Sequence, residues 1–138
     1  MGDETDAIVA RARRALGARF RPQGRSIEAG FDCIGLAAFA LDVPPLVVPC
    51  DYRLRGGTIA MLRAHLSRIG LIEVAGDPGR AGDLATFQPG PGQMHLAILT
   101  GPTIIHADAA LRRVVERPLP APWPALGTWR TAMSRRSD

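Results

Sequence analysis

Apolar residues recur at helical spacing in the first third of the chain and again near its middle. Residues 33–41 are small or apolar and carry no charge, which predicts a helix that is buried on nearly every side. An amphipathic helix is predicted before it, ending at Gly17, and another after it, beginning behind Thr58 and ending at Gly70. Their apolar positions are Ile8, Val9, Ala12, Ala15 and Leu16 in the first, and Ile59, Leu62, Leu66 and Ile69 in the second.

After Gly70 the pattern changes to short extended runs separated by turns. The runs that predict strands are residues 71–74, 83–87, 94–100, 103–107, 113–117 and 127–132. Helices followed by strands indicate the α+β class, with the N-terminal helices packed on a mostly antiparallel sheet of about five to six strands. No connection is long enough to mark a second domain. We therefore expect one domain over residues 1–138, with residues 134–138 as a frayed tail and residues 17–30 as an irregular loop.

Composition excludes several function classes. The chain has 138 residues, 46% of them hydrophobic and 22% charged, as in ordinary soluble domains. The longest apolar run, residues 34–48, is interrupted and shorter than the ~20 residues that span a bilayer, so no membrane helix is expected. The acidic N-terminus lacks the pattern of a secretory signal, which predicts synthesis in the cytoplasm without a signal peptide.

The net charge of +4 requires nucleic acid to be considered as a partner. All 17 basic residues are arginines, but they are spread along the chain, few aromatic residues accompany them, and no nucleic-acid-binding motif is present. We therefore expect no nucleic-acid partner. The charge equally favours attraction to anionic polymers, including acidic polymers of a cell wall.

Cys33 lies where a Gly- and Arg-rich segment meets the predicted apolar helix. Asp32 before it is a good capping residue, and the first turn of a helix favours the thiolate form. Gly35 is expected to leave one side of the thiol open to a substrate backbone. An isolated cysteine of this kind is more often a buried small hydrophobic residue. The second cysteine, Cys50, lies in a predicted loop, and we expect two free thiols rather than a disulfide.

His95 opens an alternating strand and would lie at the rim of a sheet. If residues 100–103 form the turn of a hairpin, Leu99 lies opposite Ile104. The side chains that then share one face are His95, Ala97, His106 and Asp108. Because Ala97 is small, the diagonal neighbours His95 and His106 can approach each other. A one-residue slip of either strand would turn His106 to the opposite face.

A thiol, a histidine and a further polar group form the arrangement that a cysteine hydrolase needs. The histidine takes and returns the thiol proton, and the third group fixes its tautomer. Cys33 and His95 fit the first two roles, and either His106 or Asp108 fits the third. A zinc site made from Cys33, Cys50, His95 and His106 is not expected, because the spacings match no compact pair of ligands.

Four segments in the same order resemble the NlpC-type family of papain-like cell-wall cysteine peptidases. They are residues 30–36 (Gly-Phe-Asp-Cys-Ile-Gly-Leu), 82–84 (Gly-Asp-Leu), 95–99 (His-Leu-Ala-Ile-Leu) and 104–107 (Ile-Ile-His-Ala). The resemblance covers most of the chain. It implies a papain-like fold and a hydrolase that cuts peptide stems of bacterial peptidoglycan, often between D-glutamate and a diamino acid, without a metal or an organic cofactor.

The resemblance also assigns roles to individual residues. Cys33 would be the nucleophile, His95 the general base and acid, and His106 the orienting residue. The acidic residue before the cysteine binds a free amino end in some members, which makes Asp32 a candidate substrate contact. Two further substrate-contact positions depart from the family pattern, because Phe20 stands in place of a tyrosine and Ile34 in place of a small hydroxyl residue.

Compact members of this kind resemble peptidases of phage tails or phage-like particles. The expected partners are therefore peptidoglycan stem peptides and phage-like tail proteins, with association to a virion or particle that acts on the cell wall. Two alternatives stay open. One is a catalytically silent structural or binding component of such a tail, and the other is a Cys–His amidase or acyltransferase for another substrate. Trp123 and Trp129 could line a groove, but packing over the sheet is the simpler expectation.

Overall fold

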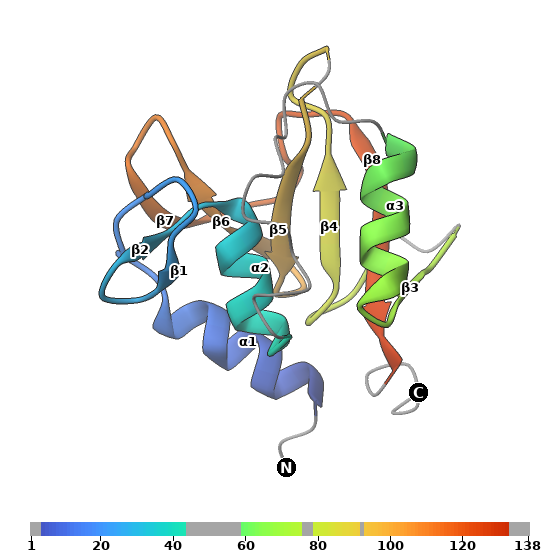
Figure 1. The fold of residues 1–138 in the computed structure, drawn as a ribbon, viewed down its shortest axis with the longest axis horizontal. Helices are drawn as coiled ribbons and strands as arrows, with labels where there is room; N and C mark the ends of the chain where they lie inside the picture. The colour runs from blue at the N-terminus through green and yellow to red at the C-terminus, as the bar shows by residue number, and fades with distance from the viewer. Residues whose placement is uncertain (1–3, 44–58, 76–78, 92, 133–138) are drawn as a thin grey trace.

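The computed structural model describes residues 4–43, 59–75, 79–91 and 93–132, which contain three helices and two antiparallel sheets (Figure 1). The helices are α1 (Glu4–Arg14), α2 (Cys33–Leu41) and α3 (Ile59–Arg68). The larger sheet has six strands in the order β3-β8-β4-β5-β6-β7. Its strands are β3 (Leu71–Glu73), β4 (Leu84–Phe87), β5 (His95–Leu99), β6 (Thr103–Asp108), β7 (Arg113–Pro118) and β8 (Ala125–Thr131). The α+β prediction is confirmed.

The helix α2 is the centre of the hydrophobic core. Eight of its nine residues are buried, as its uncharged sequence predicts. It packs against α1 and against β5 and β6, while α3 lies beside β3 (Figure 1). Ile8 and Ala12 of α1 face this core, as do Leu96 and Ile98 of β5. The packing fixes the N-terminus of α2 near the start of β5.

The six predicted strands agree with the observed ones to within about two residues at each end. The predicted hairpin register between β5 and β6 is also confirmed, because Leu99 pairs with Ile104. The sequence predicted these strands because the region from β4 to β6 consists of short apolar runs that are separated by turns. The expected cap at Thr58 and the expected frayed tail, residues 134–138, lie outside the described residues.

The predicted loop over residues 17–30 contains a small hairpin that the sequence pattern did not reveal. Its strands are β1 (Arg25–Ser26) and β2 (Gly30–Phe31). Strands of two residues are too short to show a period, so periodicity could not identify them. The hairpin packs against the first turn of α2, and it therefore belongs to the surroundings of Cys33.

A buried ion pair ties the start of β4 to β8. The carboxylate of Asp83 accepts two hydrogen bonds of 2.8 Å from Arg130, and both side chains are almost fully buried. Asp83 also accepts a bond of 2.9 Å from the amide of Arg80. A bidentate pair with its acceptors occupied is the form in which buried charges are tolerated. Among the described helices, none is long and apolar enough to cross a membrane.

Candidate active site

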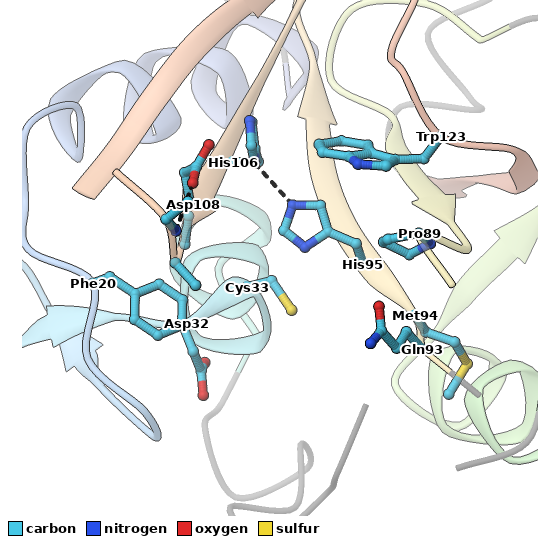
Figure 2. A pocket seen from close by; sticks show the side chains of 13 residues that line it. Phe20, Asp32, Cys33, Pro89, Gln93, Met94, His95, His106, Asp108 and Trp123 are labelled. Carbon is cyan, nitrogen blue, oxygen red and sulfur yellow. Dashed lines mark hydrogen bonds between the residues drawn. The ribbon is translucent and has the colours of Figure 1, made fainter. Parts of the chain in front are cut away.

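A pocket of about 370 Å³ lies where the N-terminus of α2 meets the ends of β5 and β6 (Figure 2). It brings together all the predicted site residues except one, and these are Phe20, Asp32, Cys33, His95, His106 and Asp108. Figure 2 shows the thiol of Cys33 and the imidazole of His95 both pointing into this pocket, from α2 and β5. The structure therefore assembles the residues of the predicted site from four separate parts of the chain.

Ile34 is the predicted site residue that the pocket does not include. Its side chain is 4% exposed and belongs to the hydrophobic core. The helix α2 is apolar on all sides, so its sequence could not show which residues face the pocket. A substrate contact by Ile34 has no support in this structure. Phe20, by contrast, is half-buried against the core and lines the pocket wall.

Asp32 is the N-cap of α2 and holds the hairpin in place. One of its carboxylate oxygens accepts a hydrogen bond of 2.8 Å from the amide of Gly35 and one of 3.0 Å from the guanidinium of Arg25. The other oxygen accepts a bond of 2.7 Å from the amide of Gln23. The carboxylate therefore serves first to join the helix start to the loop before it, and its predicted role as a substrate contact stays a prediction.

Gly35 has a different role from the expected one. A Cβ atom at this position would overlap the carbonyl oxygen of Gly24, in the loop that leads into the hairpin. The space beside Gly35 is thus occupied by the backbone of the chain itself, and not by an open path for a substrate. The expectation was wrong because the hairpin that approaches α2 carries no signal in the sequence.

The thiol of Cys33 is 3% exposed, and its pKa is raised from 9.0 to about 12. Burial is the largest cause, followed by the negative charge of Asp32. The backbone amides of Leu96, Ile34 and Cys33 lower the pKa, but they do not compensate. The sequence-based expectation that the helix start favours the thiolate is therefore wrong for this structure, because desolvation and a neighbouring carboxylate outweigh the helix N-terminus.

His95 and His106 form a hydrogen-bonded pair across the β5–β6 hairpin. Nε2 of His95 lies 2.8 Å from Nδ1 of His106, as the predicted register allows (Figure 2). His106 is 1% exposed. Asp108 instead receives bonds of 2.9 Å and 3.0 Å from the amides of Ala110 and Leu111 and so closes the turn after β6. In the described residues, His106 is therefore the hydrogen-bond partner of His95.

Both imidazoles are held in the neutral form. The pKa of His95 is lowered from 6.5 to about 4, first by burial and then by the electrostatic interaction with His106, against an opposing effect of Asp108. The pKa of His106 is also lowered, first by burial and further by Arg117, while Asp108 opposes this. A neutral imidazole can accept a proton. The pocket thus combines a protonated thiol with a neutral base rather than a preformed ion pair.

Two further parts of the pocket wall come from Trp123, for which lining a groove was the less favoured expectation, and from loop residues that the sequence did not assign to the wall. Trp123 reaches it from the proline-rich segment, with its ring centroid 5.0 Å from that of His95 and 5.3 Å from that of His106. It also packs on Phe87 of the sheet, so the expected packing over the sheet is present as well. The loop residues before His95 supply the rest of the wall, namely Pro89, Gln93 and Met94. Their adjacency to His95 in the sequence was the available signal.

The described residues contain no group of three or more His, Cys, Asp or Glu side chains that could hold a metal ion. Cys33 is a free thiol, and Cys50 lies outside the described residues. The two imidazoles at the pocket bond to each other, and the carboxylates of Asp32 and Asp108 there accept hydrogen bonds from backbone amides. This arrangement fits proton transfer within the protein better than metal binding.

The fold is that of the NlpC/p60 domain proteins, a papain-like α+β class. No family model and no curated protein matches the sequence. Among solved structures, the P60 domain of an antigen from Mycobacterium avium subspecies paratuberculosis has a TM-score of 0.65 at 18% identity, covering 94% of this chain and 95% of that one. The NlpC/p60 domain of the peptidoglycan hydrolase SagA is 28% identical with a TM-score of 0.54, covering 83% and 88%.

A third similar structure is RipD from Mycobacterium tuberculosis, described as a non-catalytic NlpC/p60 domain protein adapted to a peptidoglycan-binding function. It has a TM-score of 0.64 at 18% identity and covers 96% of this chain and 99% of that one. The same fold therefore includes hydrolases and a protein without catalysis. These three structures do not bear on the predicted resemblance to phage-tail peptidases, which stays a prediction.

Proposed function

We propose that this chain is a cysteine peptidase that hydrolyses peptide stems of bacterial peptidoglycan, with a bond of the D-glutamyl–diamino acid type as the expected target. The observation that carries the proposal is the pocket in which Cys33 begins a buried helix and faces a hydrogen-bonded pair, His95 and His106. The similarity to SagA, a peptidoglycan hydrolase, supports the choice of substrate class.

The roles follow from the orientation of the two imidazoles. Since Nε2 of His95 is bonded to His106, Nδ1 is the nitrogen that remains for the thiol proton of Cys33. As the sulfur attacks the scissile carbonyl carbon, the proton passes to Nδ1, and the imidazolium formed donates from Nε2 to His106. The backbone amide of Cys33, at the first turn of α2, would stabilise the oxyanion.

The second half of the reaction returns the enzyme to its starting state. Collapse of the tetrahedral intermediate breaks the C–N bond, and His95 donates its proton to the leaving amine. A water molecule then attacks the thioester, His95 takes a proton from it, and the acid product leaves as the thiol of Cys33 is protonated again. Because the resting thiol is neutral, its proton passes to His95 as the C–S bond forms, and the leaving amine and later the thiol are protonated as the C–N and C–S bonds break.

The direct test compares the wild-type chain with Cys33→Ala on purified peptidoglycan and on defined muropeptides. We expect the wild-type protein to release new amino groups and the variant to release none, with circular dichroism showing that both are folded. Cys50→Ser is the matched thiol control and should keep the activity. Mass spectrometry of the products identifies the bond. Equal release by wild type and Cys33→Ala would refute the proposal.

A second candidate function is a catalytically silent component that binds the cell wall, as part of a phage-like tail or otherwise. The specific observation in its favour is the buried thiol with its raised pKa, together with the likeness to the non-catalytic RipD. It predicts that the wild-type chain sediments with peptidoglycan and yields no new amino groups. Cys33→Ala would then sediment equally well.

The same dyad could also serve an amidase or acyltransferase that acts on another substrate. A panel of peptides, esters and acyl donors separates this candidate from the peptidase. Turnover of a non-wall acyl donor at a higher kcat/KM than that of muropeptides would favour it. In each of these enzymatic cases Cys33→Ala must abolish turnover.

A further inference from the structure

Trp123 forms a third ring beside the two imidazoles. The Trp123 ring is inclined at 75° to His95 and at 80° to His106, and the two imidazoles are at 89° to each other. The centroids are 5.0, 5.3 and 4.9 Å apart. Each pair therefore has the edge-to-face geometry that aromatic rings prefer, and each ring limits rotation of the other two (Figure 2).

The indole itself is held by two strands of the sheet. Phe87 of β4 lies 5.5 Å from it between ring centroids, in an edge contact at 60°. The guanidinium carbon of Arg117, on β7, lies 5.4 Å from the ring centroid, within the range of a cation–π interaction. Trp123 comes from a segment with neither helix nor strand, yet these contacts fix its ring. A loop residue is thereby made part of a rigid site.

The orientation of His95 matters because only one of its two ring orientations allows proton transfer from Cys33. In the observed orientation Nε2 meets Nδ1 of His106. Rotation of the imidazole by half a turn would place carbon atoms against His106 and break this hydrogen bond. The indole contacts both imidazoles of the pair and lines the pocket beside them, so we expect it also to limit the access of water to their hydrogen bond.

We infer that Trp123 is a positioning residue that locks the ring orientation of the His95–His106 pair, an inference that rests on the proposed cysteine peptidase function. Trp123 does not exchange a proton with the reacting groups. It acts through His95 by restricting the imidazole to the orientation that leaves Nδ1 toward Cys33.

The measured pKa of His95 depends on the charged and titratable groups around the His95–His106 pair. His95 faces His106 and Asp108 of β6, and it shares the pocket with Cys33 of α2 and with Asp32, the N-cap of that helix. His106 faces Asp108 and Arg117. The indole is uncharged but packs against the guanidinium of Arg117, so replacing it changes the titration of the pair through water access, ring orientation and the position of Arg117.

The test uses the full chain with Trp123→Ala, Trp123→Leu and Trp123→Phe, each checked for folding by circular dichroism. Nuclear magnetic resonance of the imidazole nitrogens reports the tautomer and titration of His95, assigned with His95→Gln. With Trp123→Ala we expect the pKa of His95 to rise by about one unit as water enters. We expect kcat on muropeptides to fall roughly 10- to 100-fold with KM nearly unchanged. Trp123→Phe should recover most of the lost kcat.

Trp123→Leu separates the exclusion of water from the orientation of the His95 imidazole, because leucine excludes water but has no aromatic ring. It should keep a low pKa at His95 but lose kcat and show a mixture of tautomers. If Trp123→Ala does not fold, the measurements on Trp123→Leu still test the positioning role of Trp123. Wild-type kcat and a single wild-type tautomer in Trp123→Leu would overturn the inference. An inactive wild-type chain whose His95 tautomer still depends on Trp123 would refute the peptidase proposal alone.

Discussion

The 2.8 Å contact between Nε2 of His95 and Nδ1 of His106 constrains where the protons of both rings lie. If His95 is to accept the thiol proton at Nδ1, its own proton must lie on Nε2 and be donated to His106. The proton of His106 then lies on its Nε2, a buried atom with no hydrogen-bond partner among the described residues. An unpaired buried donor costs about 1–3 kcal/mol. His106 therefore bears this cost in the proton arrangement that catalysis needs.

Replacing His106 tests its role as an acceptor. In His106→Asn the side-chain oxygen can lie near the position of Nδ1 and still accept from His95, whereas His106→Leu removes the acceptor but keeps an apolar side chain of similar size. We expect kcat of His106→Leu to fall roughly 100-fold or more, and that of His106→Asn to fall much less. Steady-state kinetics on a defined muropeptide measures both.

Stability is the control for this pair of variants. His106 is almost fully buried, so both replacements must be compared with wild type by urea unfolding before kcat is interpreted. Equal kcat in His106→Leu and wild type would show that the hydrogen bond does not orient the base. A similar loss in both variants would point to the second imidazole itself rather than to its acceptor.

The raised pKa of Cys33 predicts how the thiol reacts with an alkylating agent. With a pKa of about 12, the thiolate fraction rises about tenfold for each pH unit throughout the range 6 to 9. We expect the rate of Cys33 modification by iodoacetamide to rise in the same way without a plateau below pH 9. A Cys50→Ser background removes the other thiol. A plateau near pH 6 would instead indicate a preformed thiolate–imidazolium pair.

Acid should destabilise the fold through His95. Its pKa is about 4 in the folded chain and 6.5 ordinarily, so between these values the unfolded chain binds more protons than the folded one. The stabilising contribution is present above pH 6.5 and is lost as the pH falls to 4, and it is on the order of 3 kcal/mol. His106 contributes with the same sign. Urea unfolding at several pH values from 7 to 4.5 measures the loss.

The matched variant for this prediction is His95→Gln, which cannot titrate at this position. His65 is present in both proteins, so it does not account for a difference between them. We expect the unfolding free energy of His95→Gln to depend less steeply on pH between 6.5 and 4.5. The same slope in the two proteins would show that His95 titrates normally in the folded chain.

The sequence was sufficient where a local pattern decides the structure. The lack of charge over residues 33–41 predicted the buried helix, and the turn between Leu99 and Ile104 fixed the register that brings His106 to His95. Both features depend on neighbours within one hairpin or one helix. For this reason the amino-acid pattern alone identifies the centre of the candidate site, with Cys33 and the two histidines.

The features that the sequence did not reveal depend on packing between distant segments. The pKa of Cys33 rises because α2 is buried against the sheet, which no helix-start rule takes into account. Ile34 faces the core and not the pocket. The sequence could not show this, because all sides of the helix are apolar. Trp123 reaches the histidines from a segment rich in proline, where no period exists.

Gly35→Ala tests the close approach of the loop to α2. A methyl group there would overlap the carbonyl oxygen of Gly24, and Gly24 is itself packed against the backbone of Gly30, so the loop cannot move away without strain. We expect the unfolding free energy to fall by about 1–3 kcal/mol and kcat to fall with it, because Asp32 anchors the loop to the helix that carries Cys33. Gly90→Ala is the matched control, since its Cβ would meet only the flexible end of Gln93 at 3.1 Å. If both variants unfold at the same urea concentration, the contact at Gly24 does not limit the side chain at position 35.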